Sequence, residues 1–261
     1  MIVLGFDTAT HATAVGLRLD GDRVLQARDD PAAAEHPGHA TRLLAMAQEL
    51  LAQAEIGWDR VERIAVGRGP GRFTGLRVGI ATARALAQSL RVELVGVSSL
   101  RALALGAALR QSAPRARIAM IDARRGEVFA AAYAAGAEPS SSPTAESPVP
   151  RPAETDFPTP LRADGLAGIV AEIERLGGPR GERWQALGDG ALLYADRLAL
   201  AGVEVPPAGS PLHLIDGAAV CALGAAASVD SSAGERLLPD YRRSPDAALA
   251  RDRALALRAS P

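Results

Sequence analysis

IAVGRGPGRFTGLRVGIATARALAQSL, residues 64–90, is the stretch that decides the fold. Residues 64–66 are apolar and predict the end of a buried strand. Residues 67–71 contain three glycines and a proline, which together favour a tight turn. Thr74 is the predicted N-cap of a helix that runs to the end of the stretch, because apolar residues recur from there at helical spacing.

Two interpretations of the glycine-rich turn stay open. A glycine-rich turn from a strand into a helix can present several backbone N–H groups to an anion such as phosphate. The same glycines also let a strand and a helix pack in direct contact. No lysine follows them, so the Walker pattern is absent, and the final glycine of the dinucleotide fingerprint is also missing.

The predicted helix 74–90 is small or apolar on nearly every side. Such a helix lies either at the centre of a large core or in an interface. Gly79, Ala83 and Ala87 repeat every four positions and form a flat strip suited to close helix packing. Arg77 and Arg84 are the only charged residues of the helix, and they lie on one side of it.

Length, charge and composition limit the classes of protein to which this chain can belong. The 261 residues suffice for one large domain or two small ones. The 29 basic side chains, all of them arginine, nearly balance 30 acidic ones, so any RNA contact must be local or come through a partner. The single cysteine, Cys221, lies in an apolar run, which predicts a small buried side chain. Without a signal peptide or an apolar run of bilayer length, we expect a cytoplasmic protein with no membrane contact.

The beginning of the chain predicts three strands, at residues 2–6, 15–19 and 24–27, the last two joined by a hairpin turn. Asp7 and Thr8 follow the first strand directly. This order is similar to the start of the actin, sugar-kinase and Hsp70 superfamily, in which such a turn faces the phosphates and metal of a nucleotide. The alternative is that both side chains satisfy their own turn.

The rest of the first half alternates helices and strands. We expect helices at residues 39–54 and 98–109 and strands at residues 61–66 and 93–97. His36 and His39 lack a third ligand at suitable spacing, so we expect no metal site there.

The second half begins like the first. A strand at residues 118–121 ends in Asp122 and is followed by a turn and a partner strand at residues 128–133. We therefore predict two lobes, residues 1–110 and 111–243, with a Pro- and Ser-rich excursion at 136–160 and a charged tail at 244–261. Further expected elements are helices at 164–176, 191–200 and 215–228, a strand at 184–187 and an extended segment at 237–243.

Five segments together resemble the TsaB (YeaZ) family: FDTAT at 6–10, VGRGPGRFTGLR at 66–77, VGVSSL at 95–100, IDARRGEV at 121–128 and PDYR at 239–242. The resemblance implies an α/β fold of the actin-like (ASKHA, ribonuclease H-like) type, with two lobes of mixed sheets flanked by helices. It also implies a non-catalytic dimerisation subunit of the tRNA threonylcarbamoyladenosine machinery.

The family's catalytic partner is implied to be a paralogue, TsaD, joined by the ATPase TsaE. The paralogue transfers threonylcarbamoyl from its adenylate to N6 of the adenosine beside the anticodon, in tRNAs that read codons beginning with A. It carries a His-x-x-x-His metal pair, whereas this chain has no histidine between His39 and His213. We therefore expect an accessory subunit with no catalytic residue, no metal and no cofactor of its own.

Other partners follow from the same resemblance. ATP or ADP is expected only at the level of the complex, tRNA is contacted through the complex, and the chain can also pair with itself. Two other classes stay open, a nucleotide-dependent small-molecule kinase and a metallopeptidase-like relative.

Two sets of site residues are predicted. Asp7, Thr8 and Thr10 are the nucleotide-proximal candidates. The partner is placed on the helix 74–90, the preceding loop and the helix that starts at His39, with these contact residues: Arg68, Pro70, Phe73, Leu76, Arg77, Ile80, Ala83, Arg84, Ala87, His39 and Leu43.

Overall fold

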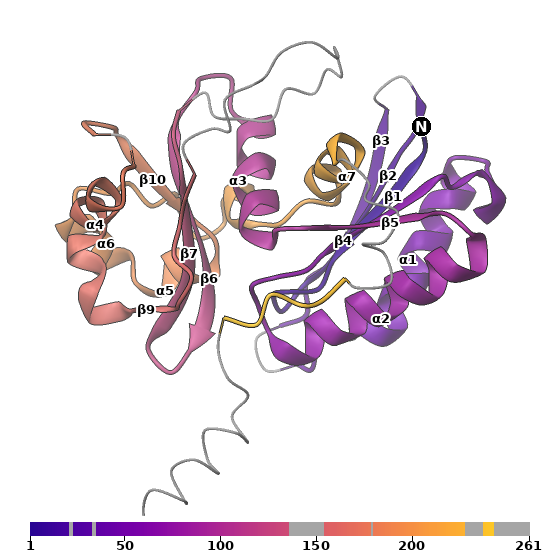
Figure 1. The fold of residues 1–261 in the computed structure, drawn as a ribbon, viewed down its shortest axis with the longest axis horizontal. Helices are drawn as coiled ribbons and strands as arrows, with labels where there is room; N and C mark the ends of the chain where they lie inside the picture. The colour runs from indigo at the N-terminus through magenta and orange to yellow at the C-terminus, as the bar shows by residue number, and fades with distance from the viewer. Residues whose placement is uncertain (21–22, 33–34, 136–153, 179, 228–236, 243–261) are drawn as a thin grey trace, which may run out of the picture.

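Two separate five-stranded sheets form the framework of the chain (Figure 1). The structure is a computed structural model, and it describes all residues except 21–22, 33–34, 136–153, 179, 228–236 and 243–261. No helix in the described part of the chain is both long and apolar enough to cross a membrane. The predicted tail at 244–261 and most of the predicted excursion lie outside the described residues.

The first sheet has the strand order β3-β2-β1-β4-β5. Its first three strands are antiparallel neighbours, and β4 and β5 run parallel to β1. The strands are β1 (Val3–Asp7), β2 (Thr13–Arg18), β3 (Val24–Asp29), β4 (Arg63–Gly67) and β5 (Glu93–Val97). An antiparallel hairpin pair followed by parallel crossovers is the ribonuclease H-like arrangement that the sequence predicts.

Helices α1 (His39–Gln53) and α2 (Phe73–Leu90) cover one face of this sheet (Figure 1). Their apolar residues pack in one cluster with β1, β2 and β4, which explains the helical spacing of apolar residues in both segments. The predicted N-cap at Thr74 is wrong. The N-cap is Arg72, two residues earlier, which has extended backbone, so α2 starts at Phe73, and no side chain caps the helix.

Helix α7 (Gly217–Ala226) covers the opposite face of the first sheet. Its position in the sequence placed it in the predicted second lobe, but it packs on β1, β2 and β4. Small residues permit this contact, since Gly217 lies against Gly16 and Cys221 lies against Gly5. The predicted division near residue 110 therefore stays a prediction, and the chain returns to the first sheet after it.

The second sheet has the order β10-β6-β7-β8, and β9 also pairs with β7. Its strands are β6 (Ala116–Arg124), β7 (Glu127–Tyr133), β8 (Glu154–Asp156), β9 (Leu161–Arg162) and β10 (Trp184–Leu187). The short helices α4 (Ile169–Arg175), α5 (Asp189–Leu193) and α6 (Ala195–Leu200) pack on it. The helix expected at 164–176 begins as a 3-10 helix, and that expected at 191–200 is broken at Tyr194.

Helix α3 (Ser99–Arg110) lies between the two sheets, as Figure 1 shows. Ser98 caps it by accepting a hydrogen bond from the backbone N–H of Arg101. Its residues are buried nearly all round, in a core cluster that takes side chains from both sheets and from α7. The two-lobed α/β class with mixed sheets is confirmed.

Part of the predicted excursion is packed. Residues 154–156 form strand β8 on β7, and Phe157 is buried in the core of the second sheet. A strand of three residues beside a proline- and serine-rich stretch gives no clear strand pattern in the sequence, so the sequence does not predict it. The description of residues 154–160 as a flexible excursion is therefore wrong.

Candidate functional site

The turn after β1 is held inside the fold. Asp7 is 1% exposed, and its carboxylate accepts hydrogen bonds from the backbone N–H of Ala9 at 2.7 Å and from the Ser99 hydroxyl at 2.6 Å. Burial raises the pKa of this carboxyl group. The Thr8 hydroxyl donates to the Gly75 carbonyl at 2.8 Å. Thr10 is half-buried and accepts a weak bond from the backbone N–H of Ala12.

The glycine-rich loop packs directly on this turn. A Cβ atom on Gly67 would lie 1.8 Å from the Asp7 carboxylate, and one on Gly75 would lie 2.0 Å from the Thr8 carbonyl. The backbone N–H groups of Arg68 and Arg72 donate to carbonyls of Val97 and Ala9. Within the described residues, Asp7, Thr8 and these loop N–H groups thus serve the packing of the loop. A nucleotide beside them stays a prediction.

Asp7→Asn is expected to leave the chain at least as stable at neutral pH. Because the folded-state pKa is raised, ionisation above about pH 3.8 favours the unfolded chain, and that penalty grows until pH passes the folded-state pKa. The amide removes the penalty and keeps the shape. Urea unfolding of both proteins at about pH 4 and pH 7 measures the difference.

Asp7→Ala is the matched comparison, because it leaves the Ala9 N–H and the Ser99 hydroxyl without their buried acceptor and should cost about 1–3 kcal/mol. A loss of similar size for Asp7→Asn at pH 7 would show that the fold requires the negative charge.

The predicted partner-contact residues divide into two groups. Those that face the core and are buried are His39, Leu43, Pro70, Leu76, Ile80, Ala83 and Ala87. Those at the surface, exposed or half-buried, are Arg68, Phe73, Arg77 and Arg84. In this chain the core of the first sheet takes up four of the buried group, Leu43, Ile80, Ala83 and Ala87, and a partner contact by that group stays a prediction. That the partner binds on these helices stays a prediction.

The outer face of α1 and α2 carries residues that the sequence did not single out. On α1, Leu44 is 44% exposed. On α2, Ala81 and Ala85 are exposed, beside the exposed Arg77 and Arg84. Their positions, opposite the buried stripe, become clear only when the sheet side of each helix is known.

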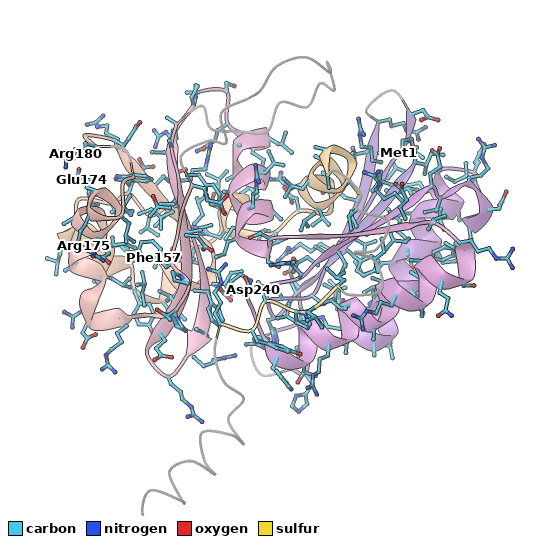
Figure 2. The ribbon with its side chains drawn as sticks, in the orientation of Figure 1. Met1, Phe157, Glu174, Arg175, Arg180 and Asp240 are labelled. Atoms are coloured by element: carbon cyan, nitrogen blue, oxygen red, sulfur yellow. The ribbon has the colours of Figure 1, made fainter. Side chains whose placement is uncertain are left out.

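Residues 237–242, which we call the strap, run from the first sheet to the second (Figure 1). Leu237 is buried and lies against Gly96, and its carbonyl accepts a hydrogen bond from Arg84. The backbone N–H of Asp240 donates to the Arg68 carbonyl at 2.7 Å. Figure 2 shows Asp240 between the two lobes and Phe157 on the side of the second.

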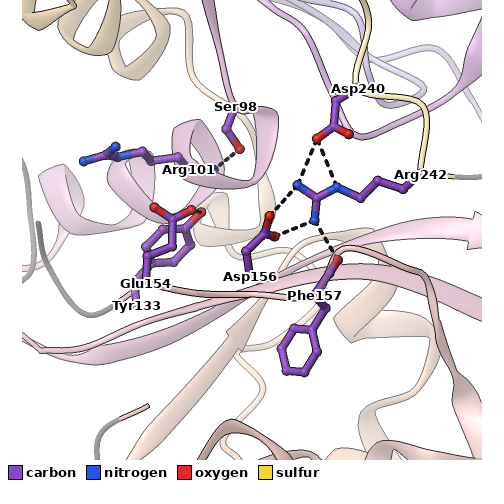
Figure 3. Close-up of polar contacts among 8 residues, drawn as sticks. All are labelled: Ser98, Arg101, Tyr133, Glu154, Asp156, Phe157, Asp240 and Arg242. Carbon is purple, nitrogen blue, oxygen red and sulfur yellow. Dashed lines mark hydrogen bonds and ion pairs between the residues drawn. The ribbon is translucent and has the colours of Figure 1, made fainter. Parts of the chain in front are cut away.

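Arg242 connects the strap to the second lobe through polar contacts (Figure 3). Its guanidinium is 9% exposed and bridges Asp240, at 2.9 Å, and Asp156, also at 2.9 Å. It also donates to the Phe157 carbonyl at 2.8 Å. A bidentate, largely buried arginine is among the stronger polar contacts in proteins. The sequence predicts an extended segment here but not these partners, which are 85 and 86 residues away.

The strap also adds an aromatic ring to α2. The rings of Phe73 and Tyr241 lie 5.0 Å apart at 32°, and the Arg77 guanidinium lies 3.9 Å from the centre of the Phe73 ring. Arg77 also donates to the Tyr241 hydroxyl at 3.1 Å. Tyr241 is 42% exposed.

The side chains of His39 and Cys221 are buried and have structural roles. His39 shares a 2.8 Å hydrogen bond with the Thr13 hydroxyl, and burial lowers the pKa of its imidazole. Burial raises the pKa of the Cys221 thiol to about 12, as expected for a small core side chain. In the part of the chain that the structure describes, no three His, Cys, Asp or Glu side chains gather where they could hold a metal ion.

Two ribonuclease H-like lobes with an α-helix between them define an actin-like protein. A family model described as TsaD, tRNA N6-adenosine threonylcarbamoyltransferase, matches residues 31–154. The tRNA threonylcarbamoyladenosine biosynthesis protein TsaB of Escherichia coli is 40% identical over 133 residues, which are 51% of this chain and 55% of that protein. The chain thus spans about half the length of that relative.

Two solved structures are similar over nearly their whole length. YeaZ from Pseudomonas aeruginosa has a TM-score of 0.64 and 27% identity, covering 91% of this chain and 98% of its own. A structure described as an uncharacterized protein with similarity to peptidase YEAZ from Pseudomonas aeruginosa has a TM-score of 0.68 and 29% identity, covering 93% and 99%. The chain is thus similar to TsaB (YeaZ) proteins, in sequence over about half of its length and in fold over most of it.

Proposed function

We propose that this chain is a non-catalytic subunit of tRNA threonylcarbamoyladenosine biosynthesis that binds the catalytic paralogue TsaD. The match to Escherichia coli TsaB carries the proposal. The buried, high-pKa thiol of Cys221 and the histidine-free stretch between His39 and His213 support the non-catalytic role. ATP or ADP and the ATPase TsaE act at the level of the complex.

The outer face of α1 and α2 is the proposed docking surface. Leu44 is an exposed apolar side chain, and Ala81 and Ala85 are small enough to let a partner helix approach α2 closely. Arg77 and Arg84 lie along one side of these alanines on the exposed part of the helix. An apolar centre with charged residues at its edge is typical of helix packing between subunits.

Ala85→Glu is expected to abolish co-elution with TsaD on a sizing column, because the added carboxylate would be desolvated without a partner in the helix contact. The folded chain should tolerate it, because the side chain points to solvent. Ala199→Glu, an exposed alanine on helix α6 of the second lobe, is the matched control and should co-elute normally.

Circular dichroism of both variants checks the fold, and the chain run alone reports whether it pairs with itself. Normal co-elution of Ala85→Glu would refute the docking surface. Modification of tRNA by the chain and the threonylcarbamoyl adenylate, with no TsaD present, would refute the non-catalytic role.

A further inference from the structure

Four arginines of the glycine-rich loop and α2 carry charge that no carboxylate among the described residues neutralises. Arg77 donates to the Tyr241 hydroxyl, Arg84 donates to the Leu237 carbonyl, and Arg72 donates to Nδ1 of His11 at 2.8 Å. Arg68 is exposed. None of these four, which we call the arginine patch, forms an ion pair with any residue that the structure describes.

Other arginines of the same lobe do have carboxylate partners. Arg28 pairs with Asp30, Arg42 with Asp29 and Arg63 with Glu93. The difference originates in the sequence, since no acidic residue occurs between Glu62 and Glu93. In a chain of net charge −1, the patch is therefore a local concentration of positive charge.

The strap contacts three of these four arginines. Arg84 contacts its start at Leu237, Arg77 contacts Tyr241, and the Arg68 carbonyl accepts from the Asp240 N–H. The carboxylates of the strap contact, Asp240 and Asp156, share Arg242 between them, which leaves one net negative charge against the three arginines that the strap contacts. The surface beside the strap thus stays positive.

An exposed ring accompanies the charge. Tyr241 packs on Phe73 with one side and is 42% exposed. Guanidinium groups bind phosphates through planar pairs of N–H groups, and aromatic rings stack on unpaired bases. An unpaired RNA strand offers partners for both features, phosphates for the charges and a base for the ring.

We propose that the arginine patch and Tyr241 bind a strand of tRNA, with phosphates on Arg68 and Arg77 and a base against the Tyr241 ring. This inference rests on the proposed function, in which tRNA is the substrate, and it adds a direct RNA contact to it. The contact is local, which agrees with the balanced charge of the whole chain.

Fluorescence anisotropy of a labelled tRNA transcript, titrated with the full chain at about 50 and 200 mM salt, tests the proposal. Arg68→Gln/Arg77→Gln should bind about tenfold more weakly at the lower salt, with a salt slope smaller by about two. Tyr241→Ala should weaken binding about fivefold or more and leave the slope nearly unchanged, because stacking releases no counterions.

Arg162→Gln/Arg175→Gln is the matched control. It removes the same formal charge from side chains of the second lobe that are 75% and 66% exposed, and it should bind tRNA like the unchanged chain. No binding by the unchanged chain at the lower salt would overturn the proposal, as would equal losses in the patch and control variants.

Co-elution with TsaD, measured on the same variants, separates the two proposals. A patch variant that keeps its tRNA affinity but no longer co-elutes would show that the patch binds an acidic protein surface, which overturns the RNA contact. If the unchanged chain does not co-elute with TsaD, the proposed function fails, and the tRNA titration still decides the RNA contact.

Discussion

Ala83→Glu is expected to unfold the chain or to lower its free energy of unfolding by about 3–5 kcal/mol. Ala83 is fully buried on the sheet side of α2, in the same cluster as Leu4, Ile64 and Val66. A glutamate there would bring an unpaired charge and extra volume into a packed core. A loss of this size is a large fraction of the stability of an ordinary domain.

Thermal unfolding followed by circular dichroism measures this effect, and Ala85→Glu is its control. The two alanines lie two residues apart on one helix, yet one is buried and the other exposed. Only the Ala83→Glu variant should lose its thermal unfolding transition. A folded, stable Ala83→Glu variant would mean that this face of α2 opens to solvent or to a partner.

The same helix shows where sequence reasoning reaches its limit. The spacing of Leu76, Ile80, Ala83 and Ala87 correctly identifies an apolar stripe on α2. It does not reveal whether another chain or the chain's own sheet covers that stripe, because both remove it from water. In the structure β1, β2 and β4 cover it, so the surface left for a partner is the opposite face.

Local elements such as strands are more predictable from the sequence than contacts between distant residues. β5 and β10 have the predicted bounds, and Ser98 caps α3, because short apolar runs beside turn residues and a serine before a helix are local signals. The site depends on distant pairs instead. Nothing near Arg242 indicates that Asp156 is its partner, and nothing near Tyr241 indicates Phe73.

The contact of helix α7 with the first sheet is another feature that the sequence does not indicate, and a second substitution tests it. Its glycines look like ordinary flexible positions in the sequence, but Gly217 lies where a Cβ atom would be 2.3 Å from the carbonyl group of Val15. The helix and strand β2 are therefore in backbone contact. The close approach lets α7 cover β1, β2 and β4 and complete the core between the two sheets.

Gly16→Ala is expected to lower the free energy of unfolding by about 3 kcal/mol, at the upper end of the usual cost of overpacking. The new Cβ atom would lie 2.4 Å from the carbonyl carbon and oxygen of Gly217. No rotamer change relieves that contact, because the atoms belong to the backbone, so α7 must move away from the sheet and loosen its packing. Urea unfolding measures the loss, and hydrogen exchange should show faster exchange in α7.

Gly165→Ala is the matched control, because no atom lies within 4 Å of the position that its Cβ would take. It should unfold at nearly the same urea concentration as the unchanged chain. If Gly16→Ala does so too, α7 does not need this backbone contact to cover the first sheet. If it is destabilised while hydrogen exchange in α7 is unchanged, the strain is absorbed within β2 instead, since antiparallel strands can shift locally without moving the helix above them.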